Sequence, residues 1–379
     1  MQGIRRVEES MGQGGEGSIS QGEMMNREVL AKSLVAACDV PAGTEITEAM
    51  VRIQSPGQGL QPNRLKDLIG RRLPVAKSQG EVFFPSDLET PAATPRRYQF
   101  NQPFGLPVRY HDIKVFSEVS NLDLVEIHLS YKDLEVDLNQ VLPVRQNIGL
   151  VIHAPELFAG DHTLDLCTED SSYRNHSIAE LQRVIDISRD LRNRFQCSDP
   201  VLLVTNVGGF SEHHHLNRSE RKPLRERLIT SLKKINTAGE VEIIPQTMPP
   251  FPWHFGGQRF HNLFVDTDFI RQFCEEQDMR VCLDVSHSKL ACNHLHIPFR
   301  QFLDQILPFT AHLHLADAKD VDGEGLQILD GDIDWVQLFE QIDQHCPKAS
   351  FIPEIWQGHK NGGEAAWLAL ERLEAAARA

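Results

Sequence analysis

The chain has 379 residues, of which 41% are hydrophobic and 24% are charged. That composition is typical of a folded globular protein, and the length predicts two domains, one of which could be a barrel of about 250 residues. The formal net charge of −15 at pH 7 repels a phosphodiester backbone, which argues against nucleic acid as a partner.

Cysteine usage and hydropathy indicate the compartment. Seven cysteines are scattered along the chain without a CxxC pair, and a chain of this size does not need disulfides to fold. No stretch approaches the roughly 18 apolar residues of a membrane span, and the N-terminus carries no apolar segment of a signal peptide. We therefore expect a reducing, cytoplasmic location and no membrane partner.

The first quarter of the chain changes character twice. Residues 1–28 are polar and Gly-rich without periodicity, which predicts a flexible lead-in with little fixed structure. From 29 to 88, short apolar runs alternate with Pro- and Gly-containing turns, which predicts a small β-rich domain. A linker with two prolines at 89–97 separates this domain from residues 98–379.

Eight short apolar runs of strand length follow the linker. They occupy residues 105–110, 124–129, 148–154, 201–206, 241–246, 280–285, 311–316 and 351–355. Helix-like stretches separate most of them, and the clearest covers 177–195, where Ser177 and Glu180 are predicted to form a capping box. Buried strands that alternate with surface helices indicate parallel βα units, so the sequence predicts an α/β fold with a (β/α)8 TIM barrel.

Polar side chains follow the carboxyl ends of these predicted strands, where TIM barrels place their chemistry. They are His153, Asn206, Gln246, Asp284, His287, His314, Asp317 and Glu354. Oxygen and imidazole ligands together suit Mn²⁺, Mg²⁺, Co²⁺ or Zn²⁺, so Asp284, His314 and Glu354 are the first candidates for a metal site. We expect Asn206 and Asp317 to contact a substrate. For each residue alone, the alternative is a buried polar group bonded to neighbouring backbone.

Two loops add candidates for substrate contacts. The loop 249–262 carries Trp253, whose ring could stack on a sugar or simply pack on the barrel rim. The Gly-rich loop 322–335 carries Glu324 and lacks the Lys-Ser/Thr pair of a P-loop. The EHHH run at 212–215 is expected to be a solvated loop, because consecutive histidines cannot all face one ion.

Three stretches of the second region resemble a known family. LDVSHS, HLHLAD and PEIWQGH resemble strands six, seven and eight of the xylose isomerase-like sugar isomerase and epimerase barrels, and the resemblance covers roughly residues 98–379. It implies divalent metal ligands at four positions, Gln246, Asp284, His314 and Glu354. It also implies substrate contacts from His287 and from the early-strand histidine His153.

Gln246 departs from that family, whose epimerising and isomerising members usually carry Glu at this position. A Gln carbonyl can coordinate a metal but cannot take a proton. We therefore expect one-base chemistry by Glu354 or His287, in a metal-dependent sugar isomerase, epimerase or related lyase. The alternative is a catalytically degenerate barrel that binds or scaffolds a sugar. An endonuclease-like phosphodiesterase is disfavoured by the acidic charge.

The first region resembles a second family. The pieces NREVLAKSLVAACDVPAGTEIT, SPGQGL and LIGRRLPVAKSQGEVFFPSDL resemble the antifreeze-like, or SAF, β-clip domain of sialic acid (N-acetylneuraminate) synthases. This resemblance implies a place in nonulosonic sugar synthesis, with Lys32 as the remaining sugar-binding cation and a synthase catalytic barrel upstream or in trans as a partner. It also implies a homodimer, because in the synthases this domain reaches the amino sugar of the partner subunit. A docking or oligomerisation module is the alternative.

Overall fold

The computed structural model describes residues 21–89, 93–197, 200–251 and 259–379, together with four isolated positions near the N-terminus. The chain divides into two compact units, Met1–Thr90 and Pro91–Ala379, and each has a hydrophobic core of its own. All seven cysteines lie in the described residues and are free. Within the described parts of the chain, no helix is both long enough and apolar enough to cross a membrane.

The first unit is a small domain of short strands and short helices. Its elements are α2 (Gln21–Leu30), β1 (Ser33–Ala36), η1 (Glu48–Met50), β2 (Val51–Gln54), η2 (Pro62–Arg64), α3 (Leu65–Leu68) and η3 (Pro85–Asp87). β1 pairs antiparallel with β2, and eight buried residues between Leu34 and Phe83 form the core. These short elements enclose a core of their own, which fits the β-rich domain expected from the sequence.

Helix α2 corrects the expectation that residues 21–28 lack fixed structure. The acidic Glu23 in its first turn and the basic Arg27 in its last turn both complement the helix dipole. The backbone N–H of Gly57 donates to the carbonyl of Glu28 at 3.0 Å. A Cβ on Gly57 would lie 2.4 Å from the carbonyl oxygen of Arg27, so only glycine allows this close approach. The helix is thereby held against the loop that follows β2.

Eight parallel strands form the centre of the second unit. They are β3 (Gly105–Val108), β4 (Leu124–His128), β5 (Gly149–His153), β8 (Val201–Thr205), β10 (Val241–Pro245), β12 (Val281–Asp284), β13 (Thr310–Leu315) and β16 (Ser350–Pro353). Hydrogen bonds order them as β3-β4-β5-β8-β10 and β12-β13-β16. Parallel bridges from Phe104 to Phe351 and from Gln246 to Cys282 join the two sheets. The strands therefore close into a barrel, which confirms the predicted fold class.

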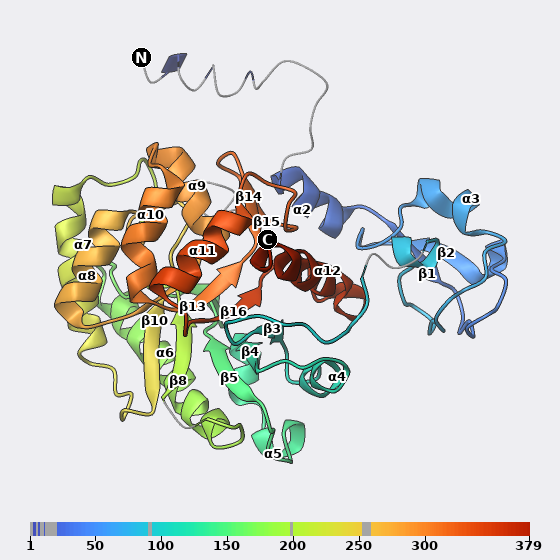
Figure 1. The fold of residues 1–379 in the computed structure, drawn as a ribbon, viewed down its shortest axis with the longest axis horizontal. Coiled ribbons are helices and arrows are strands. Elements are labelled where there is room, and N and C mark those ends of the chain that lie inside the picture. The colour runs from blue at the N-terminus through green and yellow to red at the C-terminus, as the bar shows by residue number, and fades with distance from the viewer. Residues whose placement is uncertain are drawn as a thin grey trace. The chain divides into compact units, whose positions relative to one another are not determined.

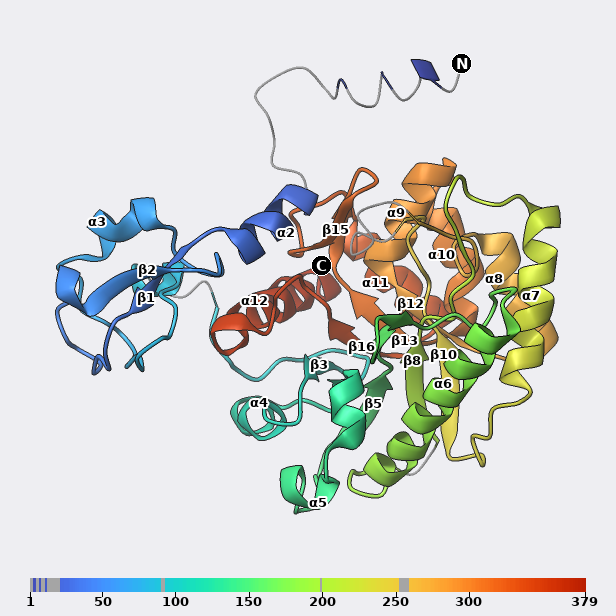
Figure 2. The ribbon, with the colours of Figure 1, turned by 180° about the vertical axis from the view of Figure 1, so that it is seen from behind.

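Helices cover the outside of the barrel. They are α4 (Ile113–Val119), α5 (Leu138–Val141), α6 (Ser171–Arg192), α7 (Arg218–Leu232), α8 (Thr267–Gln277), α9 (Val285–Leu295), α10 (Phe299–Ile306), α11 (Trp335–His345) and α12 (Lys360–Ala377). Figure 1 shows the strands of this unit in the middle with helices around them, and the opposite view in Figure 2 shows the same arrangement. The large core cluster fills the space between the helices and the strands.

Helix α6 begins at Ser171, six residues before the predicted start at Ser177. The side chain of Asp170 caps it by accepting from the backbone N–H groups of Ser172 and Tyr173. Ser177 is fully buried, and its hydroxyl contacts His162 Nε2 at 2.9 Å and accepts from the backbone N–H of Asp165 at 3.1 Å. The predicted capping box is therefore wrong, because this hydroxyl serves partners outside the helix.

The interior of the barrel changes from apolar to polar along the strands. A layer of apolar side chains contains Leu124, Val151, Val204, Ile244, Cys282, Ala311 and Ile352. Side chains alternate between the two faces of a strand, so the residue two positions later faces the interior again. On six strands that residue is polar, namely Glu126, His153, Asn206, Gln246, Asp284 and Glu354. The apolar layer thus closes the barrel below a ring of ionisable and amide side chains.

Candidate metal and substrate site

Three of the predicted ligands converge at the polar end of the barrel. One donor atom from each of Asp284, His314 and Glu354 lies within 4.8 Å of the others. His314 Nδ1 lies 2.6 Å from Glu354 Oε2 and 3.7 Å from Asp284 Oδ2. Asp284 and His314 are buried, whereas 31% of the Glu354 side chain remains exposed. The group is therefore held by the barrel and open to the outside on the Glu354 side.

Asp284 connects a strand to a helix and keeps one oxygen for the site. It is the last residue of β12 and the N-cap of α9, where its Oδ1 accepts from the backbone N–H of His287 at 2.8 Å. Its Oδ2 accepts from Gln246 Nε2 at 3.0 Å. The cap fixes the orientation of the carboxylate, so that Oδ2 faces the side chains of the neighbouring strands.

Gln246 lies among the same residues. Its Nε2 is 3.0 Å from Asp284 Oδ2 and 3.2 Å from His314 Nδ1. Its Oε1 is 3.3 Å from His153 Nε2. In this orientation the amide nitrogen, which is not a metal ligand, faces Asp284 and His314. Gln246 would offer its oxygen to an ion at this point only with the amide turned over.

The donor set suits a divalent cation. Burial would raise the pKa of Glu354, but the imidazoles of His314, His128 and His153 outweigh it and hold that pKa below its usual range. Glu354 is therefore an ionised carboxylate at neutral pH, which is the form that binds metals. Two carboxylates and one imidazole at this separation match the ligand types of Mn²⁺, Mg²⁺, Co²⁺ and Zn²⁺ sites.

His287 stands beside this group in the first turn of α9. Its Nε2 is 3.0 Å from Glu324 Oε1, and its Nδ1 is 3.0 Å from the carbonyl of Thr247 and 3.3 Å from Asp284 Oδ2. Burial alone would lower the pKa of His287, but the carboxylates of Asp284 and Glu324 outweigh it and raise the pKa to about 10. A histidine that holds its proton at neutral pH is a hydrogen-bond donor and a poor general base.

A cavity of about 570 Å³ opens above these side chains, a size that suits a small ligand. Gln246, Asp284, His287, Glu324 and Glu354 all line it, and so does His153. Apolar surface comes from Met248, Ile355 and Trp356 among others. A lining that combines polar groups with apolar surface is what a ring with hydroxyl groups on its rim requires.

The other predicted site residues lie elsewhere. Asn206 and Asp317 are buried and are not among the residues that line the cavity. Asn206 Oδ1 accepts from the backbone N–H of Gly208 at 2.8 Å, so this side chain holds its own loop. Lys32 is exposed in the first unit, and Trp253 lies outside the described residues.

Asp317 is fully occupied by its own loop. Its two carboxylate oxygens accept from the backbone N–H groups of Ala318, Leu329 and Ile333 and from the indole N–H of Trp335, at 2.8 to 3.2 Å. The side chain has no exposed surface. Asp317 therefore orders the loop between β13 and α11, and the expected substrate contact has no free oxygen to make it.

Two residues of β4 belong to the site and were missed by the sequence analysis. Glu126 is fully buried next to His314, and His128 lines the cavity with its Nδ1 3.9 Å from Glu354 Oε1. The signal was available in LVEIHL, where Leu124, Glu126 and His128 alternate and so share one face of the strand. A charged residue on the inner face of an apolar strand needs a buried partner.

Comparison with known proteins agrees with the barrel fold and with the small first domain. Residues 120–375 match the family described as xylose isomerase-like TIM barrel, and residues 31–89 match the SAF domain. The chain is a TIM barrel protein with polar side chains at the carboxyl ends of its strands. It belongs to the xylose isomerase-like TIM barrel family. Among curated proteins, no sequence matches the chain.

Solved structures similar to this chain include proteins described as sugar epimerases or epimerase-like. A D-tagatose 3-epimerase-like protein has a TM-score of 0.50 at 16% identity, over 72% of this chain and 98% of its own. L-ribulose 3-epimerase has a TM-score of 0.49 at 14% identity, over 73% and 95%. The 3-keto-D-glucoside 4-epimerase from E. coli has a TM-score of 0.49 at 13% identity, over 72% and 99%. At such identities the likeness concerns the fold.

Proposed function

We propose that this chain is a divalent-metal-dependent sugar isomerase- or epimerase-type enzyme. The observation that carries the proposal is the convergence of Asp284, His314 and Glu354 at the mouth of the barrel, beside a cavity of about 570 Å³. These three residues would hold the ion, which when bound polarises the oxygens of a hydroxy-carbonyl substrate. Family membership and the epimerase-like neighbour of the barrel support a sugar as that substrate.

Glu354 is the residue best placed to move a proton. It is ionised and partly exposed to the cavity, so it can take the proton from the carbon next to a carbonyl and return it to the adjacent carbon. Gln246 offers no second proton acceptor. A single base works on one face of the substrate, which favours aldose–ketose interconversion over epimerisation. His287 donates hydrogen bonds through a proton that it keeps.

The test is hydrogen exchange at carbon. With Mn²⁺ and a panel of aldoses, ketoses and N-acylhexosamines in D₂O, wild type should exchange a carbon-bound hydrogen of at least one sugar, as measured by ¹H NMR. Glu354→Gln should slow that exchange by at least about 100-fold, because it removes the base. Glu371→Gln, an exposed residue of α12, is the matched control and should exchange at the wild-type rate. Equal rates in wild type and Glu354→Gln would contradict the assignment of the base.

A second function is favoured by the orientation of Gln246. Its amide N–H group donates to Asp284 Oδ2 at 3.0 Å, so it can satisfy this acceptor without an ion. The barrel would then be a catalytically degenerate sugar-binding or scaffolding module. The same panel separates the two functions, because such a module binds a sugar in calorimetry and exchanges none of its hydrogens.

The SAF match supports a place in the synthesis of sialic-acid-like sugars. On this proposal the substrate is an amino sugar or its ketose partner, and Lys32 is an exposed cation available to it. The partners are a synthase catalytic barrel, upstream or in trans, and a second copy of this chain in a cytoplasmic homodimer. Exchange confined to the N-acylhexosamines of the panel would support this place, and exchange confined to unmodified sugars would contradict it.

A further inference from the structure

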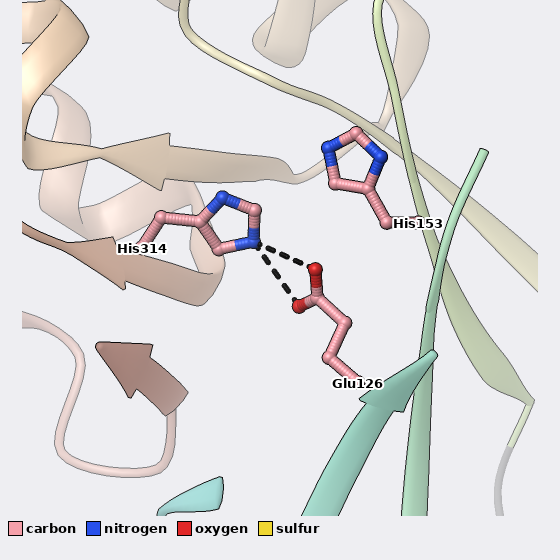
Figure 3. A group of neighbouring side chains, drawn as sticks. All are labelled: Glu126, His153 and His314. Atoms are coloured by element: carbon pink, nitrogen blue, oxygen red, sulfur yellow. Dashed lines mark hydrogen bonds and ion pairs between the residues drawn. The ribbon is translucent and has the colours of Figure 1, made fainter. Parts of the chain in front are cut away.

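One carboxylate inside the barrel is surrounded by three imidazoles. Glu126, in the middle of β4, is fully buried, and His314 Nε2 lies 3.0 and 3.1 Å from its two oxygens. His128 Nε2 lies 2.9 Å from Oε1 and His312 Nε2 lies 2.7 Å from Oε2. Figure 3 shows Glu126 reaching from β4 to His314, with the ring of His153 on its other side.

The geometry places a hydrogen on each Nε2 atom. At 2.7 to 3.1 Å the lone pair of a bare ring nitrogen would repel a carboxylate oxygen, whereas an N–H is attracted to it. Of the three contacts, the one with His314 has the geometry of a hydrogen bond, whereas His128 Nε2 and His312 Nε2 lie close to the carboxylate but are not aligned for one. Glu126 therefore accepts the hydrogen of His314 Nε2.

The other ring nitrogen of each histidine has a different partner, and His314 Nδ1, 2.6 Å from Glu354 Oε2, carries a hydrogen toward that carboxylate as long as no ion replaces it. His312 Nδ1 accepts from the hydroxyl of Ser350 at 2.7 Å, which satisfies it inside the core. His314 Nδ1 faces Glu354 and Asp284. His128 Nδ1 faces Glu354 Oε1 across the cavity, so both of these Nδ1 atoms are directed at the site.

We propose that Glu126 is a positioning residue that accepts the Nε2 hydrogen of His314, attracts the imidazole of His128 through the 2.9 Å contact of Nε2 with Oε1, and so directs their Nδ1 atoms toward the candidate metal site. The inference rests on the proposed function, because it concerns the ion that Asp284, His314 and Glu354 would hold. A carboxylate behind a histidine ligand fixes the tautomer and the ring orientation. Here one carboxylate would do so for two residues of the site, while its contact with His312 anchors it in the core.

A second metal site around Glu126 is not required by this arrangement. Donor atoms of Glu126, His153 and His314 also lie within 4.8 Å of one another. The oxygens of Glu126, however, already face three Nε2 atoms. His153 Nδ1 is taken by the carbonyl of Ala154 at 2.8 Å. This group is therefore a hydrogen-bonded support for the site that Asp284 and Glu354 complete.

Glu126→Gln is the decisive variant because an amide cannot accept from all three histidines. Its NH₂ group would oppose at least one Nε2 hydrogen, so a ring must turn or change tautomer. We expect Mn²⁺ affinity in calorimetry to fall roughly 10- to 100-fold. In the Zn²⁺-loaded protein with ¹⁵N-labelled histidine, long-range ¹H–¹⁵N NMR should show hydrogen on Nε2 of His314 in wild type and a changed pattern in the variant.

The matched control is Glu374→Gln, which alters another buried carboxylate of the same unit. Glu374 is 4% exposed and pairs with Arg96 and Arg378 at 2.9 Å. It should lose stability while its Mn²⁺ affinity and its histidine spectra stay as in wild type. Glu126→Asp keeps the negative charge on a shorter side chain, so its Mn²⁺ affinity should lie between those of Glu126→Gln and wild type. If Glu126→Gln does not fold, Glu126→Asp replaces it as the test variant.

The outcomes separate the inference from the function on which it rests. If wild type binds Mn²⁺ and both Glu126 variants bind it equally well with unchanged histidine spectra, the positioning role is overturned and the metal site stands. If wild type binds no divalent ion, the proposed function is overturned together with the inference. A loss of affinity and a changed His314 pattern in Glu126→Gln, without either change in Glu374→Gln, supports the positioning role.

Discussion

Asp284 lies at the end of β12 and Asp317 just beyond the end of the neighbouring strand β13, yet their side chains have different roles. Both are buried acidic residues at strand ends, and from the sequence both are site candidates. Asp317 accepts four N–H bonds from its own loop and from Trp335. Asp284 uses Oδ1 for the cap of α9 and points Oδ2 at Gln246 and His314. A position at a strand end thus makes an acidic residue a candidate for the site. Whether it serves the site or the local structure depends on the hydrogen-bond donors around its carboxylate oxygens.

Removing Asp317 should have the largest effect on stability. Asp317→Ala leaves four N–H donors without their acceptor, and each unsatisfied buried donor costs about 1 to 3 kcal/mol. With some of them reached by water, we expect the free energy of unfolding to fall by roughly 3 to 5 kcal/mol. Urea unfolding followed by circular dichroism measures it.

Asp284→Ala is the matched comparison for that measurement. It removes a helix cap, which typically costs about 1 kcal/mol, and also removes negative charge beside Glu354. If Asp284→Ala lowered the free energy of unfolding as much as Asp317→Ala does, the claim that Asp317 has a structural role and Asp284 a role in the site would be contradicted.

Gln246→Glu adds a negative charge next to Asp284 and none next to Asp317. It should therefore affect metal binding at Asp284 without changing the loop that Asp317 holds. A carboxylate there stands next to Asp284 Oδ2, 3.0 Å from the present amide nitrogen, so the metal-free protein should be destabilised by like charges. The added ligand charge should strengthen Mn²⁺ binding roughly tenfold. Calorimetry with Mn²⁺ tests this, with Gln246→Ala as the control that removes the amide without adding charge. Weaker binding by Gln246→Glu than by Gln246→Ala would contradict the position assigned to the ion.

The barrel could be predicted because its signal is local and repeated. Each of the eight apolar runs overlaps an observed strand, since strands buried on both faces carry consecutive apolar residues. The start of α6 could not be placed, because Ser177 looks like a cap but bonds to His162 and Asp165. Such tertiary partners leave no mark within the helix sequence.

The site residues at the ends of strands could be predicted from the sequence, whereas the site residue within a strand could not. Asp284, His314 and Glu354 could be found because parallel strands bring their carboxyl ends together. Glu126 lies two residues before the end of β4, and its role depends on His314 and His312 of β13, far away in sequence. Asp317 was misjudged because the donors from Leu329 and Ile333 come from the far end of the connection between β13 and α11, more than ten residues away. Long-range partners of buried polar groups are what sequence pattern alone does not reveal.

The central claim is that Asp284, His314 and Glu354 hold a divalent ion, and Mn²⁺ stoichiometry tests it most directly. Equilibrium dialysis followed by metal analysis should find about one ion per wild-type chain. Asp284→Ala should lose that ion, while Asp320→Ala, which changes an exposed residue just after β14 (Asp317–Lys319), should retain it. A wild-type chain without metal at saturating Mn²⁺, or an Asp284→Ala chain that binds as much as wild type, would contradict the account.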